Sequence, residues 1–175
     1  MQSEFRDVLF GEIQRIAAHD DRVMVLTADM GAMELTKFKE SFRERYINVG
    51  EAEQAGISIA AGLALGGKIV FVYGIIPFVT LRCFEQIKVD LCSMNLPVTI
   101  IGIGAGFAYG ADGPTHHAIE DIAAMRALPK MTIFSPSDPI STEHITRLAY
   151  ATPGPKYIRL DKGSYPAIFG VDHDF

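Results

Sequence analysis

Several features that mark whole classes of protein are scarce or missing in this chain of 175 residues. Its only two cysteines, Cys83 and Cys92, lie within one predicted helix, so we expect no disulfide between them and a reducing, cytoplasmic environment. The net charge of −5 argues against a nucleic-acid surface or a polybasic membrane surface. The longest weakly polar run, 55–64, is too short and too rich in small residues to span a bilayer. Small molecules or other proteins are therefore the expected partners.

Apolar runs alternate with helix-like segments along most of the chain, a pattern typical of a mostly parallel sheet covered by helices on both faces. There is no internal repeat and no low-complexity linker, so we expect one domain over residues 1–175. Ser3 is the expected cap of a first helix, and Asp138 and Pro139 mark the start of the last one. The sequence therefore predicts an α/β fold with an open sheet. Strands are expected at 23–26, 46–49, 68–73, 97–103, 131–134 and 156–160, and later helices near 52–65, 79–93, 118–127 and 139–150.

Two glutamates, Glu51 and Glu53, lie where a predicted strand gives way to a helix, in the stretch NVGEAEQ at 48–54. Ligands of open parallel sheets usually bind beyond the carboxyl ends of the strands, so a glutamate here could contact a cofactor. Carboxylates in a first helical turn are also favoured by the helix dipole alone, so position leaves both interpretations open. Residues two apart on a helix point about 200° apart, and we therefore expect only one of the two to face a ligand.

The second unusual stretch is the loop GAGFAYGADGPTHH at 104–117, which has four glycines and a proline after a predicted strand. Loops of this length inside a compact domain are usually functional. It lacks the Gly-Lys-Ser/Thr ending of a P-loop and the spacing of a dinucleotide fingerprint. His116 and His117 have no further His or Cys at ligand spacing, so we expect no metal site here.

Both stretches resemble one family, the pyrimidine-binding domain of the transketolase and 1-deoxyxylulose-5-phosphate synthase family of thiamine diphosphate enzymes. The pattern VGEAEQ followed by AAGLA, and the later pattern GADGPTH, occur here in the family's order, and the resemblance covers about residues 3–165. It implies that Glu53, which directly precedes a glutamine, hydrogen-bonds the aminopyrimidine of thiamine diphosphate and acts catalytically. Glu51 would then be only a neighbour.

The same resemblance implies roles for five further residues. Asp29 would lie beside the cofactor, although an aspartate in such a loop is also an ordinary turn residue. Phe78 would stack on the aminopyrimidine, although without the neighbouring motifs it is an ordinary core phenylalanine. Asp112 would bind a hydroxyl of the sugar substrate, and His116 would act catalytically on the oxygens of the donor and the intermediate. Arg159, in the last predicted strand, would bind substrate phosphate.

Two positions depart from the family pattern. Ile75 stands where an aromatic residue is usual, and His117 stands where transketolases have glutamine, which admits a changed substrate. The Gly-Asp-Gly motif and the later Asn that hold Mg²⁺ and the diphosphate elsewhere in the family have no match, so we expect a partner chain to supply those ligands. The family's usual third domain is not present either, which fits a split-enzyme subunit or a shortened form of a longer protein.

The resemblance thus implies one subunit of a split, thiamine diphosphate-dependent transketolase, which is inactive alone. Its partner would be a diphosphate-binding subunit corresponding to the N-terminal half of transketolase, in a heterotetramer. The enzyme would move a two-carbon ketol unit from a ketose to an aldose, with sugar phosphates as substrates. Half of a pyruvate-using enzyme similar to 1-deoxyxylulose-5-phosphate synthase is the alternative enzyme, and a non-catalytic regulatory subunit is the alternative without chemistry.

Overall fold

Six strands form one sheet in the order β3-β2-β4-β5-β7-β6, and every neighbouring pair is parallel. The computed structural model describes every residue except 1, 171–172 and 174–175. The sheet is open, because β3 and β6 form its two edges. These features confirm the predicted α/β fold. The strands are β2 (Val23–Thr27), β3 (Tyr46–Asn48), β4 (Ile69–Ile75), β5 (Val98–Ile103), β6 (Thr132–Phe134) and β7 (Lys156–Leu160).

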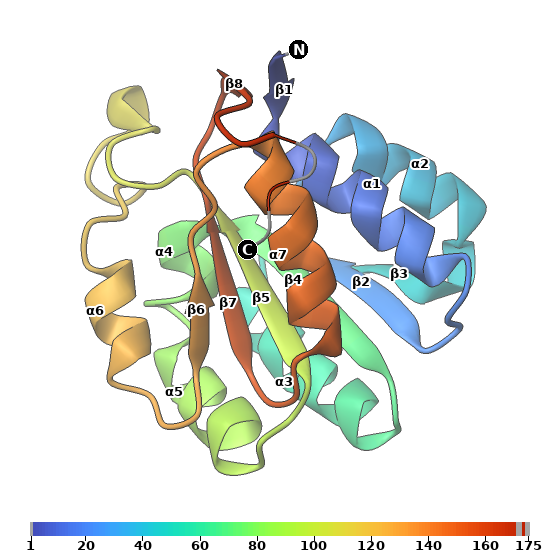
Figure 1. Cartoon of the computed structure of the whole chain (residues 1–175). Coiled ribbons are helices and arrows are strands. Elements are labelled where there is room, and N and C mark those ends of the chain that lie inside the picture. The colour runs from blue at the N-terminus through green and yellow to red at the C-terminus, as the bar shows by residue number, and fades with distance from the viewer. Residues whose placement is uncertain (1, 171–172, 174–175) are drawn as a thin grey trace.

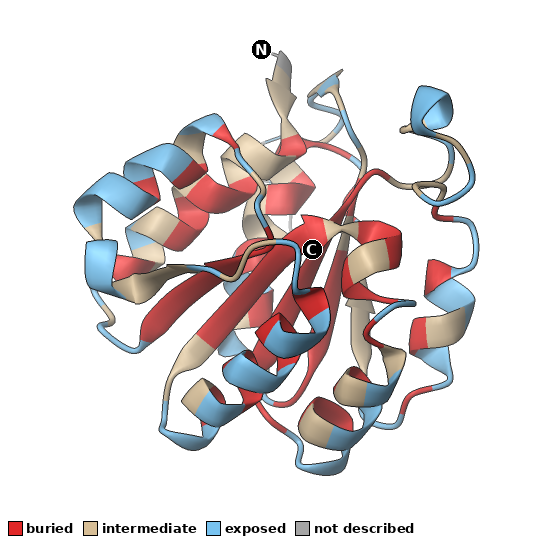
Figure 2. Ribbon diagram, turned by 180° about the vertical axis from the view of Figure 1, so that it is seen from behind, coloured by how far each residue is buried: buried red, intermediate tan, exposed pale blue. Residues whose placement is uncertain are grey.

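Helices cover both faces of this sheet (Figure 1). On one face, α1, α2 and α7 bury side chains such as Leu9 and Phe38, and on the other face α3, α6 and the π-helical segment η2 bury side chains such as Ile57 and Met125. Figure 2 shows the sheet as the buried layer between the helices. Strands covered on both faces need apolar residues at every position, which explains the continuous apolar runs. The helices are α1 (Phe5–Ala17), α2 (Met33–Ser41), α3 (Glu53–Leu65), η2 (Ile87–Ser93), α6 (Asp121–Arg126) and α7 (Pro139–Ala151).

The first helix begins differently from the expectation. Ser3 does not cap it, because Ser3 lies in the short strand β1 (Gln2–Glu4). This strand pairs antiparallel with β8 (Ser164–Pro166) in a separate two-stranded sheet. The N-terminal and C-terminal parts of the domain are therefore joined directly, which a local sequence pattern could not indicate.

Two other helical regions also differ. The helix expected at 79–93 is interrupted, and the region instead consists of α4 (Ile76–Val79), α5 (Phe84–Gln86) and η2. Helix α2 was not expected at all. At the start of α7 the prediction is confirmed, because the backbone N–H of Ser141 donates a 2.7 Å hydrogen bond to the Asp138 carboxylate. Within the described part of the chain, no helix combines the length and the apolar character needed to cross a membrane.

Candidate active site

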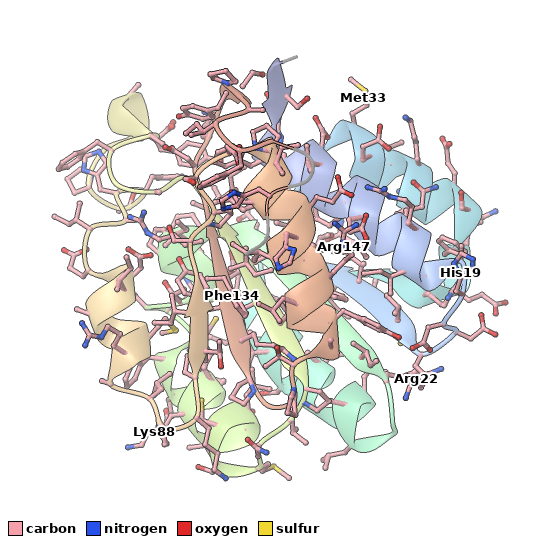
Figure 3. The ribbon with its side chains drawn as sticks, viewed as in Figure 1. His19, Arg22, Met33, Lys88, Phe134 and Arg147 are labelled. Atoms are coloured by element: carbon pink, nitrogen blue, oxygen red, sulfur yellow. The ribbon has the colours of Figure 1, made fainter. Side chains whose placement is uncertain are left out.

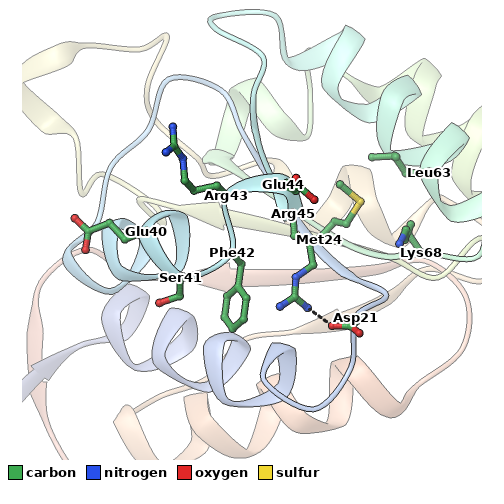
Figure 4. A pocket seen from close by; sticks show the side chains of 10 residues that line it. All are labelled: Asp21, Met24, Glu40, Ser41, Phe42, Arg43, Glu44, Arg45, Leu63 and Lys68. Carbon is green, nitrogen blue, oxygen red and sulfur yellow. Dashed lines mark ion pairs between the residues drawn. The ribbon is translucent and has the colours of Figure 1, made fainter.

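A cavity of about 330 Å³ lies at the carboxyl ends of β2 and β4, the edge of the sheet where open α/β folds bind ligands. A larger hollow of about 760 Å³ lies at the opposite edge, beside Met24 near the start of β2 and Lys68 before β4 (Figure 4). None of the predicted site residues is among the described residues that line this larger hollow. The smaller cavity is therefore the candidate active site. It is lined by Ala28, Asp29, Met30, Glu51, Glu53, Ile75, Phe78, Arg82 and His116.

Glu53 is the first residue of α3, and only 6% of its surface is exposed. One of its carboxylate oxygens accepts a 2.8 Å hydrogen bond from Nη1 of Arg82. A buried carboxylate needs such a partner, because removing a charge from water without one is costly. Glu53 is thus a buried acid at the wall of the cavity, and its partner is itself a lining residue.

Glu51 lines the same cavity but lies outside the helix, since α3 begins at Glu53. The expectation that one glutamate faces away from the other assumed that both belong to one helix, and it does not hold. The chain turns at Gly50, which has a φ of 69°, a value that favours glycine. Burial distinguishes the two acids, because Glu51 is exposed whereas Glu53 is not.

Asp29 is held at the cavity by Asn48, a residue whose role the sequence did not reveal. The side-chain amide of Asn48 donates to the Asp29 carboxylate at 3.2 Å, and its oxygen accepts from the backbone N–H groups of Asp29 at 3.0 Å and Gly50 at 3.1 Å. Asp29 has a φ of 52°, a left-handed conformation that aspartate and asparagine tolerate better than most residues. Asn48 therefore joins the loop after β2 to the turn before α3.

Phe78, Arg82 and His116 form a continuous set of contacts across the cavity. The guanidinium carbon of Arg82 lies 4.1 Å from the centroid of the Phe78 ring. The rings of Phe78 and His116 meet edge to face, with centroids 4.9 Å apart and planes at 73°. Arg82 was not among the predicted site residues. Its place four residues after Phe78 was the available signal, because this spacing brings side chains together in a helical region.

The thiol of Cys83, the residue after Arg82, takes no part in these contacts. Burial raises the pKa of Cys83 to about 12, and the charge of Glu53 adds to the rise. The Sγ atom contacts the backbone oxygen of Phe78 at 3.1 Å. Cys83 is therefore a buried structural thiol and carries little thiolate at neutral pH.

The glycine-rich loop brings only part of its polar side chains to the cavity. His116 lines the cavity, and its Nδ1 lies 3.0 Å from the Thr115 hydroxyl. Asp112 lies in the short 3₁₀ turn η3 (Gly110–Asp112), where it is exposed and does not line the cavity. The ring of His117 instead contacts Phe107, with centroids 4.9 Å apart.

Arg159 also lies apart from the cavity lining. Its Nε donates to the buried carboxylate of Asp121 at 2.9 Å, and its Nη2 donates to the backbone oxygen of Ala118 at 3.2 Å. The same Asp121 oxygen accepts a 2.7 Å hydrogen bond from Tyr157, whose pKa is raised first by burial and then by the Asp121 charge. Of the predicted site residues, the structure brings together Glu53, Asp29, Phe78 and His116, whereas Asp112 and Arg159 lie elsewhere.

Comparisons with known proteins agree with this fold. The family model described as transketolase, pyrimidine binding domain, matches residues 2–167. An apulose-4-phosphate transketolase subunit from Actinobacillus succinogenes is 40% identical over 155 residues, which cover 89% of this chain and 50% of that protein. 1-Deoxy-D-xylulose-5-phosphate synthase 1 from Geobacter metallireducens is 40% identical over 158 residues, which cover 89% of this chain and 25% of that protein.

A solved structure described as a split gene transketolase, an inactive beta4 tetramer, is similar as well. It has a TM-score of 0.86 and 35% identity, and the match covers 98% of this chain and 56% of that chain. The present chain spans about half the length of the curated transketolase subunits it matches. The chain belongs to the transketolase pyrimidine-binding domain family, as its two sequence motifs predicted.

Proposed function

We propose that this chain supplies the pyrimidine-binding half of the active site of a split, thiamine diphosphate-dependent transketolase. The observation that carries the proposal is one cavity lined by three groups: the buried carboxylate of Glu53, the aromatic ring of Phe78 and the imidazole of His116. Its similarity to an apulose-4-phosphate transketolase subunit over 89% of the chain supports the same assignment.

The residues of the cavity fit the aminopyrimidine half of the cofactor. A volume of about 330 Å³ lies at the lower end of the range for small-molecule sites, about 300–1,000 Å³. Glu53 would accept or return a proton at a ring nitrogen, and Phe78 would cover the ring with an apolar face that excludes water. Asp29 would stand beside the ring. Thiamine diphosphate, when bound, would supply the electron sink that the transfer of a two-carbon unit between sugars requires.

His116 would act on the substrate side of the same cavity. Its Nδ1 is engaged with the Thr115 hydroxyl, which leaves Nε2 to hold or donate a proton at a substrate oxygen. Asp112 would bind a sugar hydroxyl, and this requires the exposed turn that carries it to approach the cavity. Arg159 would bind a substrate phosphate, although its Nε and Nη2 now donate to Asp121 and Ala118.

The rest of the active site would come from a second chain. We propose a diphosphate-binding subunit that corresponds to the N-terminal half of transketolase and holds Mg²⁺, assembled with this chain as a heterotetramer. The proposal places the complex in the cytoplasm, where the free and buried thiols of Cys83 and Cys92 would remain reduced.

A second candidate reaction uses pyruvate as the donor. Its support is sequence identity: the chain is 40% identical to a 1-deoxy-D-xylulose-5-phosphate synthase and also 40% identical to the transketolase subunit from Actinobacillus succinogenes. The two reactions differ in the fate of the donor, because a pyruvate-using enzyme releases carbon dioxide whereas a transketolase releases a shortened aldose.

The test begins with the protein that co-purifies with the tagged chain from its native host. We expect the two chains together, with thiamine diphosphate and Mg²⁺, to transfer a ketol unit from a ketose phosphate, and each chain alone to be inactive. Carbon dioxide release from pyruvate would establish the second candidate instead. Micromolar binding of thiamine diphosphate by the isolated chain would contradict a shared site, and absence of both reactions from the assembled complex would contradict catalysis.

A further inference from the structure

Arg82 lies between the two groups that form the core of the candidate site. Its Nη1 donates to the Glu53 carboxylate at 2.8 Å, and its guanidinium carbon lies 4.1 Å from the centroid of Phe78. A guanidinium is planar, so these contacts place one flat, hydrogen-bonding group against both the acid and the aromatic ring at once. Such a group has the same recognition features as a flat heterocycle with N–H donors at its edge.

The two contacts of Arg82 are those that the proposed function assigns to the aminopyrimidine. A ring cannot stack on the face of Phe78 that the guanidinium covers, nor hydrogen-bond the Glu53 oxygen on the side where Nη1 of Arg82 already donates. The Arg82 side chain is 43% exposed, so it has a route out of the cavity into solvent. Glu53 is 6% exposed and would keep a hydrogen-bonding partner if one flat group replaced the other.

We propose that the Arg82 side chain competes with the aminopyrimidine for one position in the cavity. In the isolated subunit Arg82 occupies this position, and it moves out when the cofactor binds. This inference rests on the proposed function. Its consequence is a lowered cofactor affinity in the unassembled chain, because only the fraction of molecules with Arg82 displaced can bind. Premature occupation of half a site is thereby disfavoured.

A second buried glutamate provides a matched comparison. Glu12 in α1 is 4% exposed and pairs with Arg15 at 2.6 Å and Arg147 at 3.6 Å, and Figure 3 shows Arg147 on α7. None of these three residues lines the candidate cavity. Arg15→Met therefore removes an arginine from a buried glutamate, as Arg82→Met does, without changing the cavity.

The test uses the full isolated chain and 4-amino-5-hydroxymethyl-2-methylpyrimidine, which corresponds to the pyrimidine of thiamine and carries no diphosphate. Calorimetric titration should show at least about tenfold tighter binding to Arg82→Met than to wild type, or about 1.4 kcal/mol. Arg15→Met should bind like wild type. The double variant Arg82→Met/Glu53→Gln should lose the gain, because the freed acid provides it.

A second measurement needs no variant and remains decisive if Arg82→Met does not fold. The NMR signal of the Arg82 guanidinium should shift on titration of wild-type chain with the pyrimidine, whereas that of Arg15 should not. Unchanged or weaker binding by folded Arg82→Met, or an Arg82 signal that stays constant at saturation, overturns the inference. Ketol transfer by the assembled wild-type complex reports separately on the proposed function, which stands if transfer occurs while the Arg82 tests fail.

Discussion

Phe78 and His116 meet edge to face, with ring centroids 4.9 Å apart, although one follows β4 and the other lies in the glycine-rich loop after β5. In the proposed function, Phe78 contacts the cofactor and His116 acts on the substrate. Because the two rings are in contact, we expect a change in the packing of one to alter the position of the other.

We therefore expect Phe78→Ala to affect both cofactor binding and turnover in the assembled complex. Loss of the stacking face should weaken thiamine diphosphate binding about tenfold, and kcat should fall further because His116 loses its lateral support. Phe107→Ala is the control, since Phe107 makes a similar contact with His117 outside the cavity lining. Equal effects of the two substitutions on cofactor affinity would contradict the assignment of Phe78.

Glu53→Gln and Glu51→Gln should differ greatly, even though both residues line the cavity. The buried acid is suited to sharing a proton with a ring nitrogen, so Glu53→Gln should slow exchange of the cofactor C2 proton at least about 100-fold. Glu51 is exposed, and its replacement should cost little. Exchange measured by NMR in the complex isolates this step from sugar binding, and slow exchange in Glu51→Gln alone would reverse the assignment.

Asp138→Asn should lower the stability of the domain and remove part of its acid sensitivity. The buried carboxylate accepts hydrogen bonds from Ser141 and from the backbone N–H groups of Ile168 and Phe169. Burial acts to raise the pKa of Asp138, but these hydrogen bonds outweigh it, and the pKa lies below the usual 3.8. A lowered pKa gives stability that is present above about pH 4 and is lost as the pH falls through the folded-state pKa.

We expect the free energy of unfolding of Asp138→Asn to fall by about 1–3 kcal/mol at pH 7, because an amide replaces a charged acceptor. Below pH 4 its difference from wild type should shrink. Chemical denaturation at several pH values measures this, with Asp21→Asn as the control because the Asp21 side chain is fully exposed. A difference that is constant with pH would show that the Asp138 charge is not involved.

Lys156→Met should stabilise the domain at neutral pH. Lys156 is fully buried, its Nζ donates to the Thr152 oxygen at 2.7 Å, and burial lowers its pKa from 10.5 to about 8. Between these values the unfolded chain binds more protons, so wild-type stability should rise from pH 8 to 10.5. The variant should lack this rise and gain about 1 kcal/mol at pH 7. An unchanged pH profile would place the ionisation of Lys156 outside this range.

The sequence patterns predicted the sheet well because buried parallel strands leave a local signal. Runs such as 97–103 are apolar at nearly every position, and the structure buries β5 along its whole length. Helix α2 leaves a weaker signal, since only Leu35 and Phe38 among its residues are buried. Its remaining positions are exposed or half-buried, so 33–41 lacks a continuous apolar stripe.

The candidate site was predicted in part for a similar reason. Glu53 stands beside local turn and helix signals, and the spacing of Arg82 from Phe78 is a local signal as well. The contacts of Asn48 and Arg82 with the two acids, in contrast, join residues that are distant in the sequence. Asn48 contacts Asp29, and Arg82 contacts Glu53, and neither pairing follows from local spacing. The pairing of Arg159 with Asp121 depends on a similar long-range contact, which explains why its position apart from the cavity was not anticipated.

The pairing of β1 with β8 also affects the order in which the chain folds during synthesis. Gln2 is paired with Pro166, so β1 has no partner until nearly the whole domain has left the ribosome. Helix α1 and the parallel strands can assemble earlier, because their partners emerge between these two segments. The first strand of this domain is therefore the last to acquire its neighbour, and β1 stays unpaired until Pro166 has emerged from the ribosome.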